Sequence, residues 1–319
     1  MLDSKELKLI FNHLETISIN PIHIKINEST LNIPNTNMFL NNKTKNNIVK
    51  LTNHCKVIFS INHCKFYIYI SYNNDINITR FINIISYIIQ LITHFNTISK
   101  TISIYYYLLN DKKTYNSKIT ILKPEHVNSG VFSNDTTITI WRKEEVMKVT
   151  FHELIHALNF DYRIDNQSMI DYYQQKYDLL SDSINTYEAY TEIWALILNT
   201  YLFTRLLNNS ITYKKFLSNL KIEYNFSKYQ CNKVLHLDRS NLNKYTNVFS
   251  YYILKFEIFS NLDKFLRYCI VNNKNILQLR NKTRYYQLLK TFTKIKKYKL
   301  SKKNINYKTM RMTYLQLSI

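Results

Sequence analysis

The spacing of apolar residues changes once along this chain of 319 residues, close to Trp141. Before that point, short runs rich in Ile, Tyr, Phe and Thr are bounded by polar turns, which is typical of β-strands. After it, apolar residues recur about every 3.6 positions, which is typical of helices. The sequence therefore predicts an α+β fold, in which a mixed sheet in the N-terminal part packs on one helix and a mainly helical part follows.

The expected elements follow from the same patterns. We expect two strands within 56–72 and three more at 101–109, 118–123 and 136–141. We expect helices at the amphipathic N-terminus (1–14), over 80–97, from about Lys143 through Leu158, from about Thr186 through Leu207, and over 247–269. Glu144 and Glu145 would then stand in the first turn of the third of these helices, where the helix dipole favours acids.

Glycine and cysteine usage excludes several classes of site. The only glycine is Gly130, in a polar segment that we expect to be a loop, so neither a G-x-S-x-G turn nor a phosphate-cradling loop can be built. The four cysteines have no activating motif, and the N-terminal residues have the pattern of an amphipathic helix and not of a signal peptide, so we expect reduced thiols. The most apolar stretch, 81–92, is too short to span a bilayer. These features predict a soluble cytoplasmic protein.

The charge is strongly positive, with 43 Lys and Arg against 22 Asp and Glu. No acid occurs from residue 271 to the end, and 290–303 is the densest basic run. The segment 290–311 is therefore a candidate contact for nucleic acid or another polyanion. A solvated tail enriched in lysine by A- and T-rich codons explains the same composition, and both interpretations stay open.

One motif carries chemistry. His152, Glu153 and His156 form the pattern H-E-x-x-H. Residues four apart share one face of a helix, so the two imidazoles can ligate one ion while Glu153 reaches a bound water as a base. The flanking residues are apolar, so the helix should be buried. The next helix brings Glu188 and Glu192 to one face.

These residues resemble the gluzincins, zinc peptidases that pair H-E-x-x-H with a glutamate on a later helix. The resemblance implies a zincin-like fold, Zn²⁺ held by His152, His156 and Glu188, and Glu192 as the carboxylate that holds a ligand histidine. Glu188 follows His156 by 32 positions, which is longer than in thermolysin-like enzymes. Clostridial neurotoxin light chains have a comparable spacing, and with that alignment Glu192 becomes the alternative ligand.

The stretch from 127 to 158 also looks like H-E-x-x-H proteins of large nucleocytoplasmic DNA viruses, which would place the protein in a host-cell cytoplasm or a virion. The resemblance covers about 100–270. We therefore expect an N-terminal α/β region over 1–100, a zincin-like catalytic region over 101–270 and a basic tail over 271–319. The implied substrate is a peptide or protein.

The resemblance implies hydrolysis of peptide bonds with Glu153 as general base. A second group must then stabilise the developing oxyanion, and the candidates are Tyr251, Tyr252 and His236. The strand 136–141 could form the sheet edge along which an extended peptide aligns.

Two alternatives remain. The protein could be a nucleic-acid-binding or virion structural protein with a catalytically silent zinc site, whose tail aromatics (Tyr285, Tyr286, Phe292, Tyr298 and Tyr307) stack on bases. A second metal site could use His54, Cys55, His63 and Cys64, although two hairpin strands with buried thiols explain the same residues.

Overall fold

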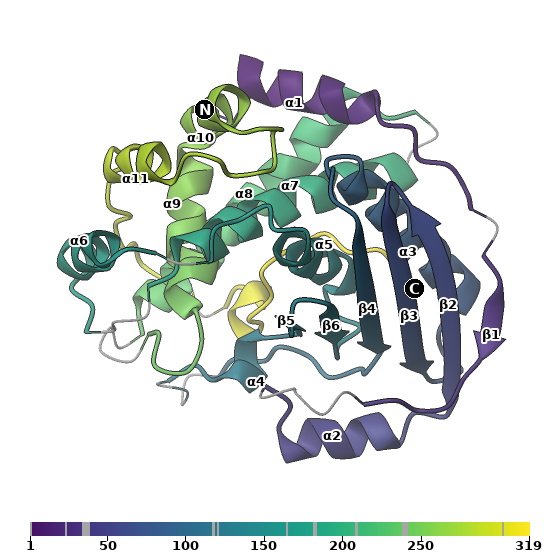
Figure 1. Cartoon of the computed structure of the whole chain (residues 1–319). Coiled ribbons are helices and arrows are strands. Elements are labelled where there is room, and N and C mark those ends of the chain that lie inside the picture. Colours follow the sequence, from purple (N-terminus) through teal and green to yellow (C-terminus); the bar gives the residue numbers. More distant parts are fainter. Residues whose placement is uncertain are drawn as a thin grey trace. The chain divides into compact units, whose positions relative to one another are not determined.

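The computed structural model describes residues 2–22, 24–33, 39–116, 119, 121–163, 165–180, 184–207, 210–237, 242–301 and 303–319. The chain divides into two compact units that alternate along the sequence. The sheet unit comprises 17–112, 128–159 and 316–319, and the helical unit comprises 1–16, 113–127 and 160–315. Figure 1 gives the element labels.

The sheet unit contains a six-stranded mixed sheet, ordered β1-β2-β3-β4-β6-β5. Strands β3, β4 and β6 are parallel, whereas β1 pairs antiparallel with β2, β2 with β3, and β5 with β6. The strand bounds are β1 Ile26–Glu28, β2 Asn53–Ile61, β3 Cys64–Tyr72, β4 Lys100–Tyr107, β5 Gly130–Ser133 and β6 Thr137–Ile140. The predicted α+β class is confirmed, as are the strands at 56–72, 101–109 and 136–141.

Three predictions about strands were wrong. Strand β6 is not an edge, because β5 pairs with it and forms the edge of the sheet instead. Gly130 lies in that strand and not in a loop. The segment 118–123 forms no strand at its described positions, and Lys118 and Thr120 lie outside the described residues.

Two helices pack on one face of the sheet, α3 (Ile78–Thr93) and α5 (Val146–Ala157). Tyr106 of β4 contacts both helices. Its ring meets Phe81 of α3 edge-on at 5.2 Å between centroids, and its hydroxyl shares a 3.1 Å hydrogen bond with that of Thr150 in α5. The core of this unit therefore fixes α5 against the sheet.

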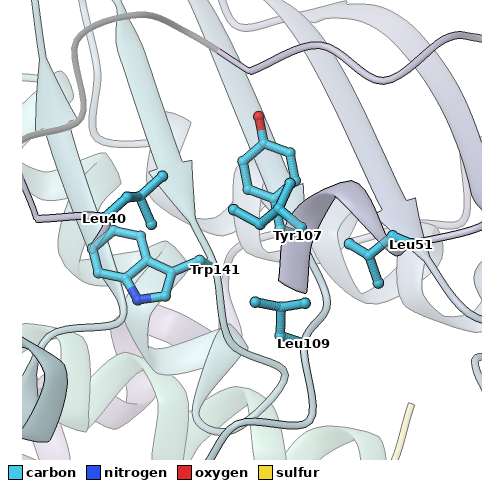
Figure 2. Close-up of a cluster of buried hydrophobic side chains, with 6 residues drawn as sticks. Leu40, Leu51, Tyr107, Leu109 and Trp141 are labelled. Carbon is cyan, nitrogen blue, oxygen red and sulfur yellow. The ribbon is translucent and has the colours of Figure 1, made fainter. Parts of the chain in front are cut away.

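Helix α2 (Asn42–Val49) and the residues around it pack on the opposite face of the sheet, at the end where Tyr107 lies. The helix follows segment 31–40 and buries Ile48 in a cluster with Tyr107 and Leu109. Figure 2 shows how the ring of Tyr107 lies among Leu40, Leu51 and Trp141 in this cluster.

The helical unit contains the remaining helices. They are α1 Lys5–Glu15, α4 Pro124–Val127, α6 Gln167–Tyr177, α7 Thr186–Leu207, α8 Tyr213–Leu235, the π-helix η2 Phe249–Leu254, α9 Lys255–Ser260, α10 Leu262–Asn272, α11 Lys282–Lys290 and the 3₁₀ helix η3 Ile305–Lys308. The predicted helices at the N-terminus and from Thr186 to Leu207 are confirmed. The helix expected over 247–269 exists as three consecutive segments, which change from π to α at Lys255 and break at Asn261.

The basic C-terminal region folds into the helical unit. Among the aromatic residues that we expected to contact nucleic acid, Tyr285, Tyr286 and Phe292 are at most 6% exposed. Tyr298 is the exposed ring of that set, at 40%. The region after residue 271 is thus not simply a solvated tail. Among the described residues, no helix is both long and apolar enough to cross a membrane.

Candidate metal centre

Helix α5 begins at Val146, three residues later than the sequence predicts. The backbone N–H of Lys143 still bonds to the carbonyl of Leu109, two residues after the end of β4, and a turn follows from Lys143 to Val146. Glu145 is the N-cap and has a left-handed backbone with φ of 63°. The expectation of acids in the first turn was therefore wrong, because the sheet holds the chain extended up to Lys143.

The two histidines of the motif converge within this helix. The Nε2 atoms of His152 and His156 lie 3.0 Å apart, with the rings at 80° to each other. Both residues are 6% exposed. Two imidazole nitrogens that point at the same place in a buried environment are suited to sharing a proton or binding one cation.

Glu153 lies beside the only glycine of the chain. A Cβ placed on Gly130 would stand 2.6 Å from Cγ1 of Val149 and 2.8 Å from Oε1 of Glu153. Both distances are shorter than real Cβ contacts allow, so the backbone of β5 can approach α5 here only because residue 130 has no side chain. The backbone of β5 therefore lies directly against the side chain of Glu153.

Glu188 occupies the first turn of α7 in the helical unit and is 9% exposed. The side-chain amide of Asn247 donates to its Oε1 at 3.1 Å, and Asn185 donates to Oδ1 of Asn247 at 2.5 Å. One oxygen of Glu188 is thus oriented by an amide chain. Sequence reasoning missed Asn185, Asn247 and the role of Gly130, since no local pattern links these residues to the motif.

One ligand atom each of His152, His156 and Glu188 lies within 4.8 Å of the others, and all three residues are buried, so this group could hold a metal ion. The donor set fits such an ion. Two imidazole nitrogens and one carboxylate oxygen are the ligands found in catalytic zinc sites, where a fourth position remains for water or substrate.

Glu192, the alternative ligand, lies one turn further along α7. Its Oε2 is 4.0 Å from Nζ of Lys255, and the two side chains are only 2% and 1% exposed. The ammonium group of Lys255 also donates to the carbonyl of Met312 at 2.9 Å. The group of three ligands contains Glu188 and not Glu192, which favours Glu188 as the third ligand.

The candidate oxyanion groups all lie in the helical unit. Tyr252 is fully buried and its hydroxyl donates to the carbonyl of Met310. His236 is the exposed C-cap of α8, and its Nδ1 lies 2.8 Å from the carbonyl oxygen of Asn232. Tyr251 lies one turn after Asn247, and the backbone N–H of Tyr251 donates to the carbonyl of Asn247 at 3.0 Å. Of the three, Tyr251 is tied by this bond to the residue that orients Glu188.

The second metal proposal finds no support. Asn62 and His63 form the tight turn of the β2–β3 hairpin, both with positive φ, and Cys55 and Cys64 are buried on its strands. Burial raises the pKa of the Cys55 thiol to about 11, which disfavours the thiolate that a metal needs. Within the described ranges, His152, His156 and Glu188 are the one group that could hold an ion.

Comparisons with known proteins do not assign the chain to a family. No family model matches it, and no curated protein or solved structure is detectably similar to it.

Proposed function

We propose that the protein is a zinc-dependent peptidase of zincin type, with His152, His156 and Glu188 as ligands and Glu153 as general base. The observation that carries the proposal is the 3.0 Å approach of the two Nε2 atoms, together with a buried carboxylate within reach of the same point. The H-E-x-x-H spacing supports peptidase chemistry, because Glu153 follows the first ligand directly.

The bound ion would supply a Lewis acid that activates water and polarises a peptide carbonyl. Glu153 would accept the proton of the attacking water and pass it to the leaving amine. Gly130 leaves room for the Glu153 carboxylate, and the side-chain amide of Asn247 orients that of Glu188. Tyr251 is the preferred candidate for stabilising the oxyanion, because it lies one turn from Asn247 in the π-helix η2.

An extended peptide would pair with β5, which is an edge strand of the sheet. The sequence predicts this role for 136–141, which contains the interior strand β6. Of the two edge strands, β5 is the one that packs against α5, and its first residue touches Glu153. A peptide added along β5 would therefore run past the general base. An intracellular location stays a prediction from the sequence.

The metal content tests the proposal most directly. Protein purified without chelators should contain about one zinc per chain. We expect His152→Ala and Glu188→Gln to lose zinc, and Glu192→Gln to retain it. His54→Ala is a matched control, because His54 is half-buried, its Nδ1 lies 3.0 Å from the hydroxyl of Ser71, and it is not among the candidate ligands.

Peptidase activity is tested separately, by mass spectrometry of a mixed peptide library. Glu153→Gln should bind zinc normally but cleave no peptide. A folded wild type that neither contains nor takes up zinc would refute the proposal. Zinc binding without any cleavage of the library would leave the silent-site alternative as the better account.

A further inference from the structure

The sheet unit carries an aromatic and basic surface that the proposed peptidase does not use. It lies on the face of the sheet opposite α3 and α5. We define the open face by the five residues Lys56, Lys65, Tyr67, Tyr69 and Tyr105. The register places them side by side, because Tyr69 pairs with Lys56 of β2 and with Tyr105 of β4.

The rings of the open face are ordered by each other and by lysines. Tyr69 and Tyr105 stack in parallel, with centroids 4.7 Å apart and planes 7° apart. Nζ of Lys56 lies between two rings, 5.0 Å from the centroid of Tyr69 and 5.3 Å from that of Tyr67, and Nζ of Lys65 lies 5.0 Å from the centroid of Tyr67. The alternate residues of β3, Phe66 and Ile68, are buried on the other face.

The three strands that carry the open face contribute lysines and no acids to it. Strands β2, β3 and β4 contain no Asp or Glu. Helix α2 also has no acid, and it adds the exposed residues Lys43 and Lys45 where it covers one end of the face. The partner that complements such a surface is a polyanion with flat apolar groups.

We propose that the open face binds single-stranded nucleic acid. Tyr67 is the ring on which a base can stack, because two flexible lysine side chains lie over it, whereas Tyr69 is already stacked on Tyr105. When a base displaces Lys56 and Lys65, the two ammonium groups can pair with the flanking phosphates. Tyr69 lies two residues after Tyr67 along β3, which is about 6.6 Å away. The next nucleotide would therefore extend from Tyr67 toward the stacked pair of Tyr69 and Tyr105.

A single strand fits this surface better than a duplex. The faces of duplex bases are hidden in their own stack, whereas unpaired bases can lie on aromatic side chains of a sheet. Readers of duplex DNA enter a groove with a helix or a two-stranded ribbon, and the open face instead spans three adjacent strands. The proposal is independent of the metal centre, because none of the five residues is a candidate ligand.

Fluorescence anisotropy with the full-length protein tests the proposal. The probes are a labelled 16-nucleotide single strand and the same strand annealed to its complement. We expect the single strand to bind more tightly than the duplex. Tyr67→Ala should weaken binding about tenfold, whereas Tyr67→Phe should bind like wild type because the ring is kept.

The lysines are tested by salt dependence. Replacing both Lys56 and Lys65 by Ala should reduce the slope of log K against log salt by roughly 1.4, since each lost phosphate contact on a single strand contributes about 0.7. Tyr245→Ala is the matched control. Tyr245 is 45% exposed and has Nζ of Lys244 5.5 Å from its ring, but it lies in the helical unit.

Several results would overturn the proposal. One is absence of binding at low salt, and another is equal affinity for the duplex. Loss of binding in a Lys294, Lys296 and Lys299→Ala variant, with Tyr67→Ala unaffected, would assign binding to the basic run. Concentration-dependent dimerisation that Tyr67→Ala abolishes would show that a second copy of the chain covers the face.

Discussion

Gly130 and Glu153 approach so closely that a methyl group on residue 130 would stand 2.8 Å from the Glu153 carboxylate. The only glycine among 319 residues is therefore the residue that allows β5 to pass the proposed general base. Its φ is not in the left-handed region, so the requirement is space and not backbone conformation. This relationship is local to the sheet unit.

Gly130→Ala is expected to impair catalysis more than metal binding. The added methyl group must displace Glu153 or Val149, and a small displacement of a general base can lower the rate by about 100-fold. We expect kcat/KM to fall by at least tenfold, while zinc content stays near one per chain. Overpacking should also cost about 1–3 kcal/mol of unfolding free energy, measurable by urea denaturation.

A double variant separates the two effects. Val149→Ala should relieve the steric cost and restore stability to Gly130→Ala, but it leaves the contact with Glu153 in place. Activity should then stay low although stability recovers. If the double variant regains full activity, Gly130 acts through stability alone. Ser133→Ala, at the other end of β5, is the control and should change neither property.

Asn247→Ala is expected to weaken zinc binding about 10- to 100-fold, because partners that orient a ligand carry that share of metal affinity. The side-chain amide of Asn247 donates to Oε1 of Glu188 at 3.1 Å. The measurement is competition with a chelating dye.

The control for this prediction is Asn232→Ala. Asn232 exchanges two hydrogen bonds with the backbone of Tyr298, so its loss should lower stability and leave zinc affinity unchanged. Equal zinc affinity in Asn247→Ala and wild type would argue against Glu188 as a ligand.

The local sequence was sufficient to predict the H-E-x-x-H helix and the pair of glutamates on α7. Both depend on spacing within one helix, which is fixed at 3.6 residues per turn. Asn247 could not be found this way, because it lies 59 positions from Glu188 and reaches it only through folding. An Asn in an Asn-rich chain gives no signal by itself.

The same distinction explains the sheet. Strands β2, β3 and β4 are eight or nine residues long and their apolar pattern is strong. Strands β1 and β5 have only three and four residues, and they are defined by their partners and not by their own sequence. Gly130 suggested a loop because glycine is common in turns, whereas here it permits close contact between a strand and a helix.

Because Glu192 and Lys255 form a buried ion pair, we expect substitutions at these two residues to have non-additive effects on the free energy of unfolding. Their charged atoms lie 4.0 Å apart and are almost fully buried. Replacing Lys255 by Met leaves a buried carboxylate, which should cost about 3–5 kcal/mol. Adding Glu192→Gln should recover a large part of that loss. A double-mutant cycle in urea measures the coupling, and additive effects would show that the two charges do not depend on each other.

Burial of Lys233 should make the free energy of unfolding depend on pH. Lys233 is 1% exposed, and its Nζ donates to the carbonyls of Asn306, Tyr307 and Thr309. Burial lowers the pKa of Lys233 from 10.5 to about 7. Between these two values the unfolded chain binds one proton more than the folded chain, so the free energy of unfolding should rise with pH in that window.

The expected contribution is at most about 1.4 kcal/mol per pH unit, and it vanishes below pH 7, where both states are protonated. Urea denaturation of wild type and Lys233→Met at pH 7, 8 and 9 checks this. The stability difference between the two proteins should change in favour of wild type as the pH rises. A difference that is constant over this range would mean that the three carbonyl oxygens keep Lys233 protonated in the folded state, because they hold its ammonium form against the cost of burial.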